Sequence, residues 1–235
     1  MSRSDHDRRI AEMFDTVAPR YDFLNRVLSL GRDASWRRRA TGHARLAANE
    51  VALDLGVGTG DLAFDLLAAS APSSRVLGVD LSEAMLERVR RRAAASPLGP
   101  RFEARAADAQ ALPFADATFA RVTAAFAVRN FGDLDAALRE MRRVLRPGGR
   151  AVVLEFSMPP HPLVRAGFRA YIHGVVPLVA AALGGDAAAY RYLPGSVERF
   201  PTADALADRF RAAGFARVSF ERLMLGGVAI HIAEA

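Results

Sequence analysis

Short apolar runs alternate with amphipathic helical patterns along most of the chain. The runs are rich in Val, Leu and Ala, which is typical of strands buried on both faces of a parallel sheet. They lie at 51–55, 75–80, 101–106, 119–126 and 151–156. Helical patterns occupy 61–70, 134–145 and 203–213, and a closing hairpin is expected at 215–221 and 226–232. The alternation predicts an α/β fold with a doubly wound, mostly parallel sheet.

Two segments interrupt this alternation. Helical spacing with little strand character fills most of the stretch before the first apolar run, and Trp36 is expected to pack that stretch onto the core. Three prolines open the other segment, 158–200, and a broad apolar face follows them. We expect a single domain, 1–235, with an N-terminal helical lid (1–48) and a helical insertion (158–200) that covers the substrate. Such an apolar insertion suits a lipophilic substrate or contact with a bilayer.

The first apolar run leads into a glycine-rich turn. Residues 56–60 carry glycine at every second position, and without a Cβ the backbone can approach a ligand closely. The following helix would point its N-terminal amides at that ligand. The spacing differs from the G-x-G-x-x-G of dinucleotide sites, and the flanking Asp54 and Asp61 would repel a pyrophosphate. S-adenosylmethionine (SAM), which carries a sulfonium and an ammonium, fits these acids better.

Acids also follow the next two strands. Asp80 lies where a carboxylate can accept both hydroxyls of a ribose, and Ser82 can cap the next helix in its place. Asp80 therefore indicates a nucleoside ligand, without deciding between NAD and SAM. Asp108 and Ala109 follow the third strand, and if the fold resembles that of SAM-dependent methyltransferases, an adenine would lie at this turn. Without that analogy Asp108 could be a plain turn residue.

Polar side chains at two further places are candidates for chemistry. Arg129 and Asn130 follow the fourth strand, and no Asn/Asp-Pro-Pro-aromatic box stands there, which argues against nucleic-acid amino groups as substrate. Their donors would lie beside the transferred methyl group. Tyr21, Asp22 and Asn25 form a polar group in an otherwise apolar N-terminal segment, as expected for a lid over a pocket.

The charge of the chain is basic but dispersed. The 32 basic residues, all of them Arg, and the 26 acidic residues give a net charge of +6. The densest run, 37–39, is short and predicts a solvated helix face, so we expect no nucleic-acid partner; an anionic membrane surface is the better alternative. Without Cys there are no thiolate metal sites or Cys nucleophiles, and we expect no metal. The N-terminus has no apolar signal, which predicts a cytoplasmic protein, with a peripheral position at the inner face of the membrane left open.

Several motifs resemble one family. They are Val17-Ala-x-x-Tyr-Asp-x-x-Asn25, Ser29-x-Gly31 with Trp36, Ala111-Leu-Pro-Phe114, Phe126-x-x-Arg-Asn130, Arg143-Val-Leu-Arg-Pro-Gly-Gly149, Leu154-Glu-Phe-Ser157 and Tyr190-Arg-Tyr-Leu193. Together they cover nearly the whole chain and resemble the bacterial quinone C-methyltransferases that make menaquinone and ubiquinone. The resemblance implies a class I SAM-dependent methyltransferase fold, Rossmann-like, with a seven-stranded, mostly parallel sheet and helices on both faces.

The resemblance implies SAM contacts at Thr59, Asp80, Asp108 and Ala109. The glycine turn and the strand ends beside it add Asp54, Gly56, Gly58, Gly60 and Ala125 to the expected cofactor residues. The expected catalytic residues are Arg129 and Asn130, which would stabilise a phenolate, and Tyr21 and Asp22, which would relay its proton. Asn25, Tyr190 and Tyr192 would bind the substrate. Two positions depart from the family: Asp33 stands where His is frequent, and Ala125, where Ser or Gly is usual, can offer only backbone contacts.

The resemblance points to a reaction as well. The family methylates a ring carbon of a polyprenylated quinol with SAM, leaving S-adenosylhomocysteine. We expect demethylmenaquinol as substrate, with the 2-methoxy-6-polyprenyl-benzoquinol of ubiquinone synthesis or another small lipophilic molecule as alternatives. A nucleotide-binding dehydrogenase is opposed by the glycine spacing. The sequence allows a homodimer without requiring one.

Overall fold

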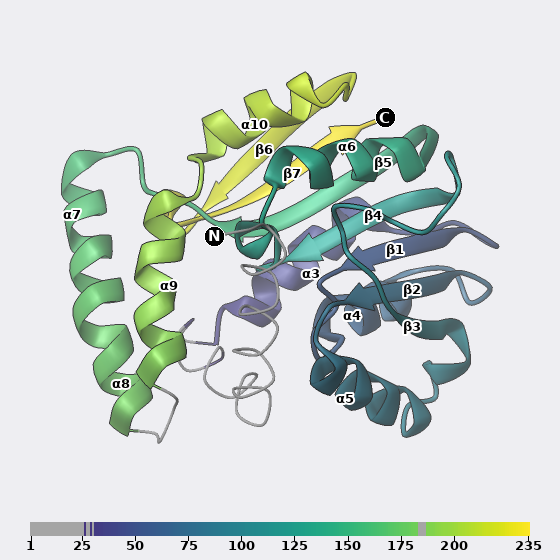
Figure 1. Cartoon of the computed structure of the whole chain (residues 1–235), viewed down its shortest axis with the longest axis horizontal. Helices are drawn as coiled ribbons and strands as arrows, with labels where there is room; N and C mark the ends of the chain where they lie inside the picture. Colours follow the sequence, from purple (N-terminus) through teal and green to yellow (C-terminus); the bar gives the residue numbers. More distant parts are fainter. Residues whose placement is uncertain (1–25, 27–28, 30, 183–186) are drawn as a thin grey trace.

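One seven-stranded sheet lies at the centre of the fold (Figure 1). The computed structural model describes residues 26, 29, 31–182 and 187–235. The strands are β1 (Val51–Leu55), β2 (Arg75–Asp80), β3 (Phe102–Ala106), β4 (Phe119–Ala125), β5 (Leu145–Phe156), β6 (Arg217–Leu223) and β7 (Val228–Glu234). Their order is β3-β2-β1-β4-β5-β7-β6; the pairs from β3 to β5 are parallel, and β7 runs antiparallel to both β5 and β6. The mostly parallel sheet is confirmed.

Helices cover both faces of the sheet. One face carries α3 (Asp33–Ala44), α4 (Asp61–Ala69) and α5 (Glu83–Ala94), and the other carries α6 (Leu134–Val144) and α10 (Ala203–Ala212). Alternate residues of the central strands enter the two hydrophobic clusters: Ala52 packs on the side of α3 and α4, while Leu53 packs on the side of α6. Burial on both faces explains why these strands are nearly continuous apolar runs.

The helix starts follow capping chemistry. The Ser82 hydroxyl accepts the Met85 backbone N–H at 3.1 Å, and the Thr202 hydroxyl accepts that of Ala205 at 3.3 Å. The cap expected at Ser82 is confirmed. The fifth strand differs from expectation because it begins at Leu145, which pairs with Phe119 before the register between β4 and β5 shifts. Helix α6 therefore ends one residue earlier than its apolar pattern predicted.

A helical insertion lies between β5 and α10. It consists of α7 (Pro162–Ala170), a π-helical turn (Tyr171–Val175), α8 (Val176–Ala182) and α9 (Ala187–Arg199), drawn at the left of Figure 1. Met158, Phe168, Ile172 and Val197 form a small hydrophobic cluster of its own. Among the described helices, none is long and apolar enough to cross a bilayer. The insertion's role as a substrate cover stays a prediction.

Helix α3 belongs to the packed body of the domain. It contacts α4, β4 and β5, and Trp36 meets Phe126 edge to face with ring centroids 6.4 Å apart. The expected packing role of Trp36 is thus confirmed. Most of the N-terminal lid predicted at 1–48 falls outside the described residues, so the lid remains a prediction.

Candidate active site

A pocket opens at the carboxyl ends of β1, β2 and β4 and beside the loop that follows β3, the edge at which doubly wound sheets bind ligands. Eight of the nine residues predicted to bind the cofactor line it: Asp54, Gly56, Gly58, Thr59, Asp80, Asp108, Ala109 and Ala125. The ninth, Gly60, is instead the N-cap of α4 in a left-handed conformation. Its contact with the cofactor stays a prediction.

The glycine turn is shaped for close approach. Gly58 has φ +52°, and a Cβ built there would have only the Gly56 carbonyl oxygen, at 4.0 Å, as a neighbour, so the space in front of it is open. Gly56 has φ +61°, and a Cβ there would come within 2.5 Å of the Ala127 Cβ. Glycine at 56 therefore lets the segment that follows β4 pass close to the turn, whereas glycine at 58 leaves room for a ligand.

Asp80 is held in a fixed orientation at the end of β2. Its Oδ2 accepts the Gly58 N–H at 2.9 Å and its Oδ1 accepts the Ser82 N–H at 3.0 Å. A carboxylate can accept several hydrogen bonds, and this one stands at the edge of the pocket. The geometry suits the predicted ribose role, which itself stays a prediction.

Asp54 is a buried carboxyl group under the pocket. Burial is the main cause that raises the pKa of Asp54 to about 7, and the negative charge of Asp80 raises it further. A hydrogen bond from the Thr123 hydroxyl, at 2.7 Å, acts in the opposite direction and lowers this pKa. A cation bound in the pocket would favour the ionised form of this group.

Asp108 is fixed by the residue two positions on. One of its carboxylate oxygens accepts both the backbone N–H of Gln110, at 2.8 Å, and its side-chain amide, at 3.0 Å. The side-chain oxygen Oε1 of Gln110 in turn accepts the Asp133 backbone N–H at 2.5 Å. Asp108 and Ala109 thus present a rigid edge to the pocket at the site where we predicted adenine.

The two residues predicted for catalysis after β4 lie in different surroundings. Asn130 lines the pocket, and the Tyr192 hydroxyl donates to its Oδ1 at 3.3 Å. The side chain of Arg129 is 7% exposed and donates to the Glu155 carboxylate at 2.8 Å and to the Phe126 carbonyl at 2.6 Å. Direct contact between Arg129 and a substrate stays a prediction. Glu155, which the sequence did not single out, is the acid of the apolar strand β5.

The remaining predicted residues are less fully placed. Tyr192 lies on α9, which brings the insertion to Asn130, and burial raises the pKa of its phenol. Tyr190 lies on the same helix, but its side chain is outside the described part of the structure. Tyr21, Asp22 and Asn25 lie outside the described residues, and their roles stay predictions.

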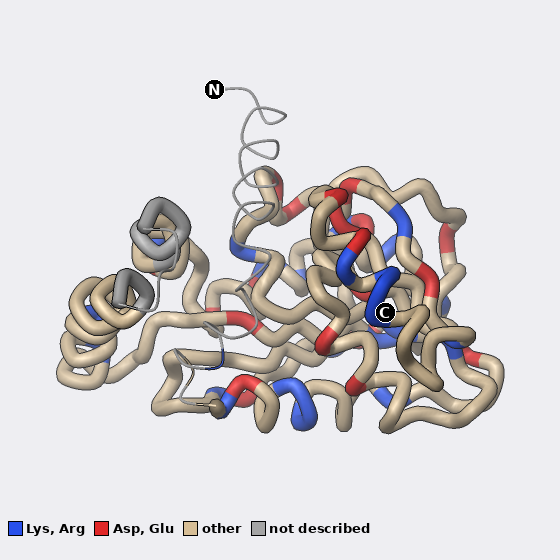
Figure 2. Tube along the Cα trace, turned by 90° about the horizontal axis from the view of Figure 1, so that it is seen from below, with Lys and Arg blue, Asp and Glu red and all other residues tan. Residues whose placement is uncertain are grey.

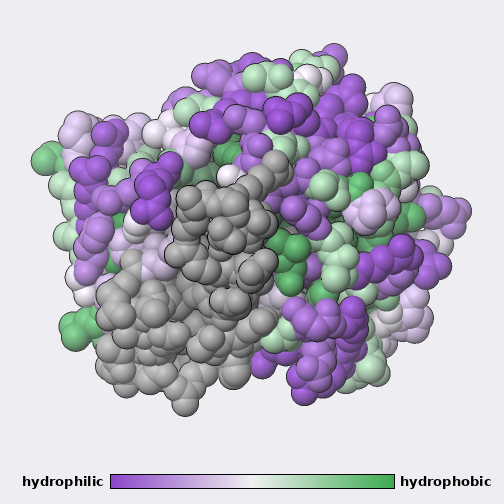
Figure 3. Space-filling view, in the orientation of Figure 1, coloured by the Kyte–Doolittle hydropathy of each residue, from purple (hydrophilic) through white to green (hydrophobic). Residues whose placement is uncertain are grey.

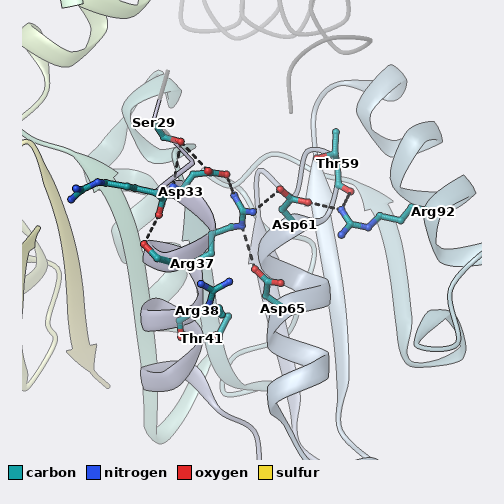
Figure 4. A network of polar contacts seen from close by, with 11 residues as sticks. Ser29, Asp33, Arg37, Arg38, Thr41, Thr59, Asp61, Asp65 and Arg92 are labelled. Atoms are coloured by element: carbon teal, nitrogen blue, oxygen red, sulfur yellow. Dashed lines mark hydrogen bonds and ion pairs between the residues drawn. The ribbon is translucent and has the colours of Figure 1, made fainter. Parts of the chain in front are cut away.

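A cluster of charges that the sequence did not predict joins α3 to α4 (Figure 4), and its members Asp33, Arg37 and Asp61 line the pocket. Arg37 on α3 contacts Asp33 at 2.7 Å, Asp61 at 3.0 Å and Asp65 at 3.3 Å, and Asp61 also pairs with Arg92 at 2.7 Å. Burial alone would raise the pKa of Asp33, but hydrogen bonds from Arg37 and Ser29 outweigh it, and that pKa is lowered. The prediction that 37–39 is a solvated face is wrong for Arg37, which is 9% exposed.

A helical-wheel argument could have revealed Arg37. Trp36, Ala40 and Ala44 define the buried face of α3, and Asp33 and Arg37 lie on that same face, one turn apart. A charged pair at this spacing on a buried face must be matched by partners from another element, here α4.

The charges around the pocket test which ligand fits. Among the described residues that line it, five are aspartates and one is basic: Asp33, Asp54, Asp61, Asp80, Asp108 and Arg37. This set opposes a pyrophosphate and suits the sulfonium and ammonium of SAM. Elsewhere the basic residues alternate with acids along the body of the molecule, as Figure 2 shows. Within the described residues no cluster of His, Asp and Glu could hold a metal ion.

Comparison with known proteins agrees with this geometry. The profile of the ubiE/COQ5 methyltransferase family matches residues 2–235. The chain belongs to the ubiE/COQ5 methyltransferase family. It is therefore a methyltransferase, and SAM is its cofactor.

Two relatives and one solved structure illustrate the match. A demethylmenaquinone methyltransferase of Thermus thermophilus is 49% identical, over 94% of this chain and 99% of the relative. A ubiquinone/menaquinone biosynthesis C-methyltransferase of Geotalea daltonii is 41% identical, over 98% of each. A SAM-dependent methyltransferase of Thermotoga maritima, with 19% identity, aligns at a TM-score of 0.67 over 95% of this chain and 98% of its own. This ubiE/COQ5-family chain thus has the fold of SAM-dependent methyltransferases.

Proposed function

We propose that this methyltransferase methylates a ring carbon of a polyprenylated quinol, with demethylmenaquinol as the substrate. The contact between Tyr192 and Asn130 carries the proposal, because it joins the insertion to the edge of the cofactor pocket. A quinol ring needs polar groups at its hydroxyls, and its prenyl tail needs an apolar path such as the insertion offers. The names of the two relatives support the same class of substrate.

The residues at this edge suit the chemistry of a phenol. Bound in the pocket, SAM supplies an electrophilic methyl group. The ring carbon becomes nucleophilic as the adjacent hydroxyl loses its proton, so the protein must stabilise a growing negative charge on that oxygen. The hydroxyl of Tyr192 engages Oδ1 of Asn130, which directs the side-chain amide to act through its N–H groups. Asn130 is therefore the proposed donor to the quinol oxygen.

Arg129 contributes positive charge close to Asn130. An arginine guanidinium stays protonated near neutral pH, so Arg129 cannot act as the base. Pairing with Glu155 fixes its position beneath the turn that follows β4. Burial raises the pKa of Tyr192, so this phenol acts as a hydrogen-bond donor near neutral pH. Tyr21 and Asp22 remain the proposed relay for the proton.

A direct assay separates the proposed substrate from its alternatives. The protein is incubated with labelled SAM and either demethylmenaquinol or the demethylated benzoquinol of ubiquinone synthesis. We expect a higher kcat/KM with demethylmenaquinol, the naphthoquinol, than with the benzoquinol. Transfer to both quinols would mean that the pocket accepts either ring. Transfer to neither quinol would refute the proposal and favour another lipophilic substrate.

Asn130→Ala provides the sharpest test of the site. Loss of one donor to a developing oxyanion should lower kcat about 10²- to 10³-fold, with SAM affinity unchanged by calorimetry. Tyr192→Phe should cause a smaller loss, since it only frees the amide to rotate. Tyr171→Phe in the same insertion is the matched control and should keep full activity. Equal losses of kcat and of SAM affinity in Asn130→Ala would contradict the assignment.

The insertion is also the proposed contact with a membrane surface. Leu163 and Leu178 are 79% and 72% exposed, and hydrophobic atoms appear at the outer edge of the insertion in Figure 3. A substrate with a long prenyl tail partitions into bilayers, so a peripheral contact would give this enzyme access to it.

A further inference from the structure

Arg37 is a nearly buried guanidinium in the wall of the cofactor pocket. It lines the pocket together with Asp61 and Leu62 at the start of α4. Its Nη1 contacts Asp33, its Nη2 contacts Asp61 and its Nε contacts Asp65. A guanidinium has five N–H donors, and these three contacts leave one hydrogen on each terminal nitrogen for a ligand.

The position of Arg37 follows from the order of the strands. Asp108 follows β3 at one edge of the sheet, and Asp80 ends β2, the next strand inward. Helix α3 packs against α4, β4 and β5, on the other side of β1. A nucleoside placed at Asp108 and Asp80 would therefore direct its sulfur-bearing side chain past the glycine turn towards Arg37.

We propose that Arg37 binds the α-carboxylate of SAM. The five aspartates that line the pocket repel a carboxylate, and Arg37 is the cation among the described lining residues. A guanidinium held in place binds a carboxylate strongly, with two parallel hydrogen bonds where the geometry permits. Asp33 and Asp65 orient it from the sides of α3 and α4. The inference rests on the use of SAM and is independent of which quinol is methylated.

The competing explanation is that Arg37 only joins α3 to α4. In that case its removal would affect every pocket ligand alike, because the wall itself would shift. A carboxylate contact instead predicts a loss confined to ligands that carry the carboxylate. SAM and decarboxylated SAM differ by this group alone, so the pair distinguishes the two explanations.

The experiment measures both ligands by calorimetry on four proteins: wild type, Arg37→Gln, Arg37→Lys and Arg92→Gln. We expect Arg37→Gln to weaken SAM binding about 10- to 100-fold and to leave binding of decarboxylated SAM nearly unchanged. Arg37→Lys should keep part of the preference for SAM. Arg92 pairs with the same Asp61 but does not line the cofactor pocket, so Arg92→Gln should retain the wild-type ratio.

Equal losses for the two ligands in Arg37→Gln would overturn the inference. Should this variant fail to unfold cooperatively, Arg37→Lys decides instead, and equal weakening of SAM and decarboxylated SAM there would likewise overturn the inference. Failure of the wild-type protein to bind SAM would overturn both the contact and the cofactor. Normal SAM binding without methyl transfer to any quinol would refute the proposed substrate and leave the role of Arg37 standing.

Discussion

His231 and Asp54 are buried ionisable side chains whose pKa values are shifted by desolvation. The His231 imidazole lies on β7, donates from Nε2 to the Ala203 carbonyl oxygen at 2.8 Å and stacks between Phe210 and Phe220. Its pKa is lowered to about 4, so it is neutral in the fold. The pKa of Asp54 is raised to about 7. The two shifts act on stability in opposite directions, since Asp54 disfavours folding as the pH rises and His231 disfavours it as the pH falls.

The effect of His231 can be isolated by substitution. The unfolded chain protonates His231 near its usual pKa of 6.5 and the folded protein only near 4, so stability is lost as the pH falls through this window. Between pH 7.5 and pH 5 the wild type should lose about 2 kcal/mol more than His231→Gln, whose amide can still donate to the carbonyl. Urea unfolding followed by circular dichroism measures it. Asp54 is present in both proteins, so its contribution to the pH dependence cancels in the comparison. Equal pH dependence of stability in the two proteins would contradict the lowered pKa of His231.

At the residue scale, the acids of the pocket were easier to predict from the sequence than the residues that form ion pairs. Asp54, Asp80 and Asp108 stand at the ends of apolar runs, where burial and strand order place them without further information. Arg37 and Glu155 were missed because each depends on a contact distant in sequence, with α4 and with Arg129 respectively. A charged residue within an apolar face signals such a partner but does not identify it.

At the element scale, the glycine turn is open to a test with a matched control. Gly58 and Gly148 both have positive φ, +52° and +72°, and neither has an atom closer than 4 Å to a Cβ built on it. Substitution by Ala should cost each about 1–2 kcal/mol of stability through backbone strain. Only Gly58→Ala should also weaken SAM binding, because its methyl group would enter the pocket. Urea unfolding and calorimetry measure the two effects, and identical SAM affinity in the two variants would refute the turn's role.

Strand and helix positions were predictable to within a few residues because the central strands are buried on both faces. The start of β5 was not, since Leu145 joins the strand through pairing with Phe119. The insertion was recognisable from its prolines, but its contact with Asn130 depends on how α9 folds back, which no local pattern specifies.

At the scale of the whole molecule, the sheet ends in two charged edge strands. Glu103 and Arg105 lie on β3, and Arg217, Glu221 and Arg222 lie on β6. Charged edges resist pairing with another sheet. The homodimer that the sequence allows stays a prediction, and it would have to form through helices or loops rather than by extending the sheet.

The exposed leucines of the insertion predict how the molecule meets a membrane. The double variant Leu163→Ser/Leu178→Ser should bind anionic vesicles about tenfold more weakly, because two apolar side chains no longer enter the bilayer interface. Vesicle co-sedimentation measures this. Activity towards a short-chain quinol in solution is the control and should be unchanged. Undiminished vesicle binding would exclude these leucines as the contact.

The excess of aspartates around the pocket also affects the end of each catalytic cycle. Methyl transfer converts a cationic sulfonium into a neutral thioether, so the attraction between these carboxylates and the bound molecule weakens at the moment the product forms. S-adenosylhomocysteine should therefore compete poorly with fresh donor, and the enzyme should resist product inhibition. The carboxylates that attract SAM would thus hold S-adenosylhomocysteine less strongly and favour its release.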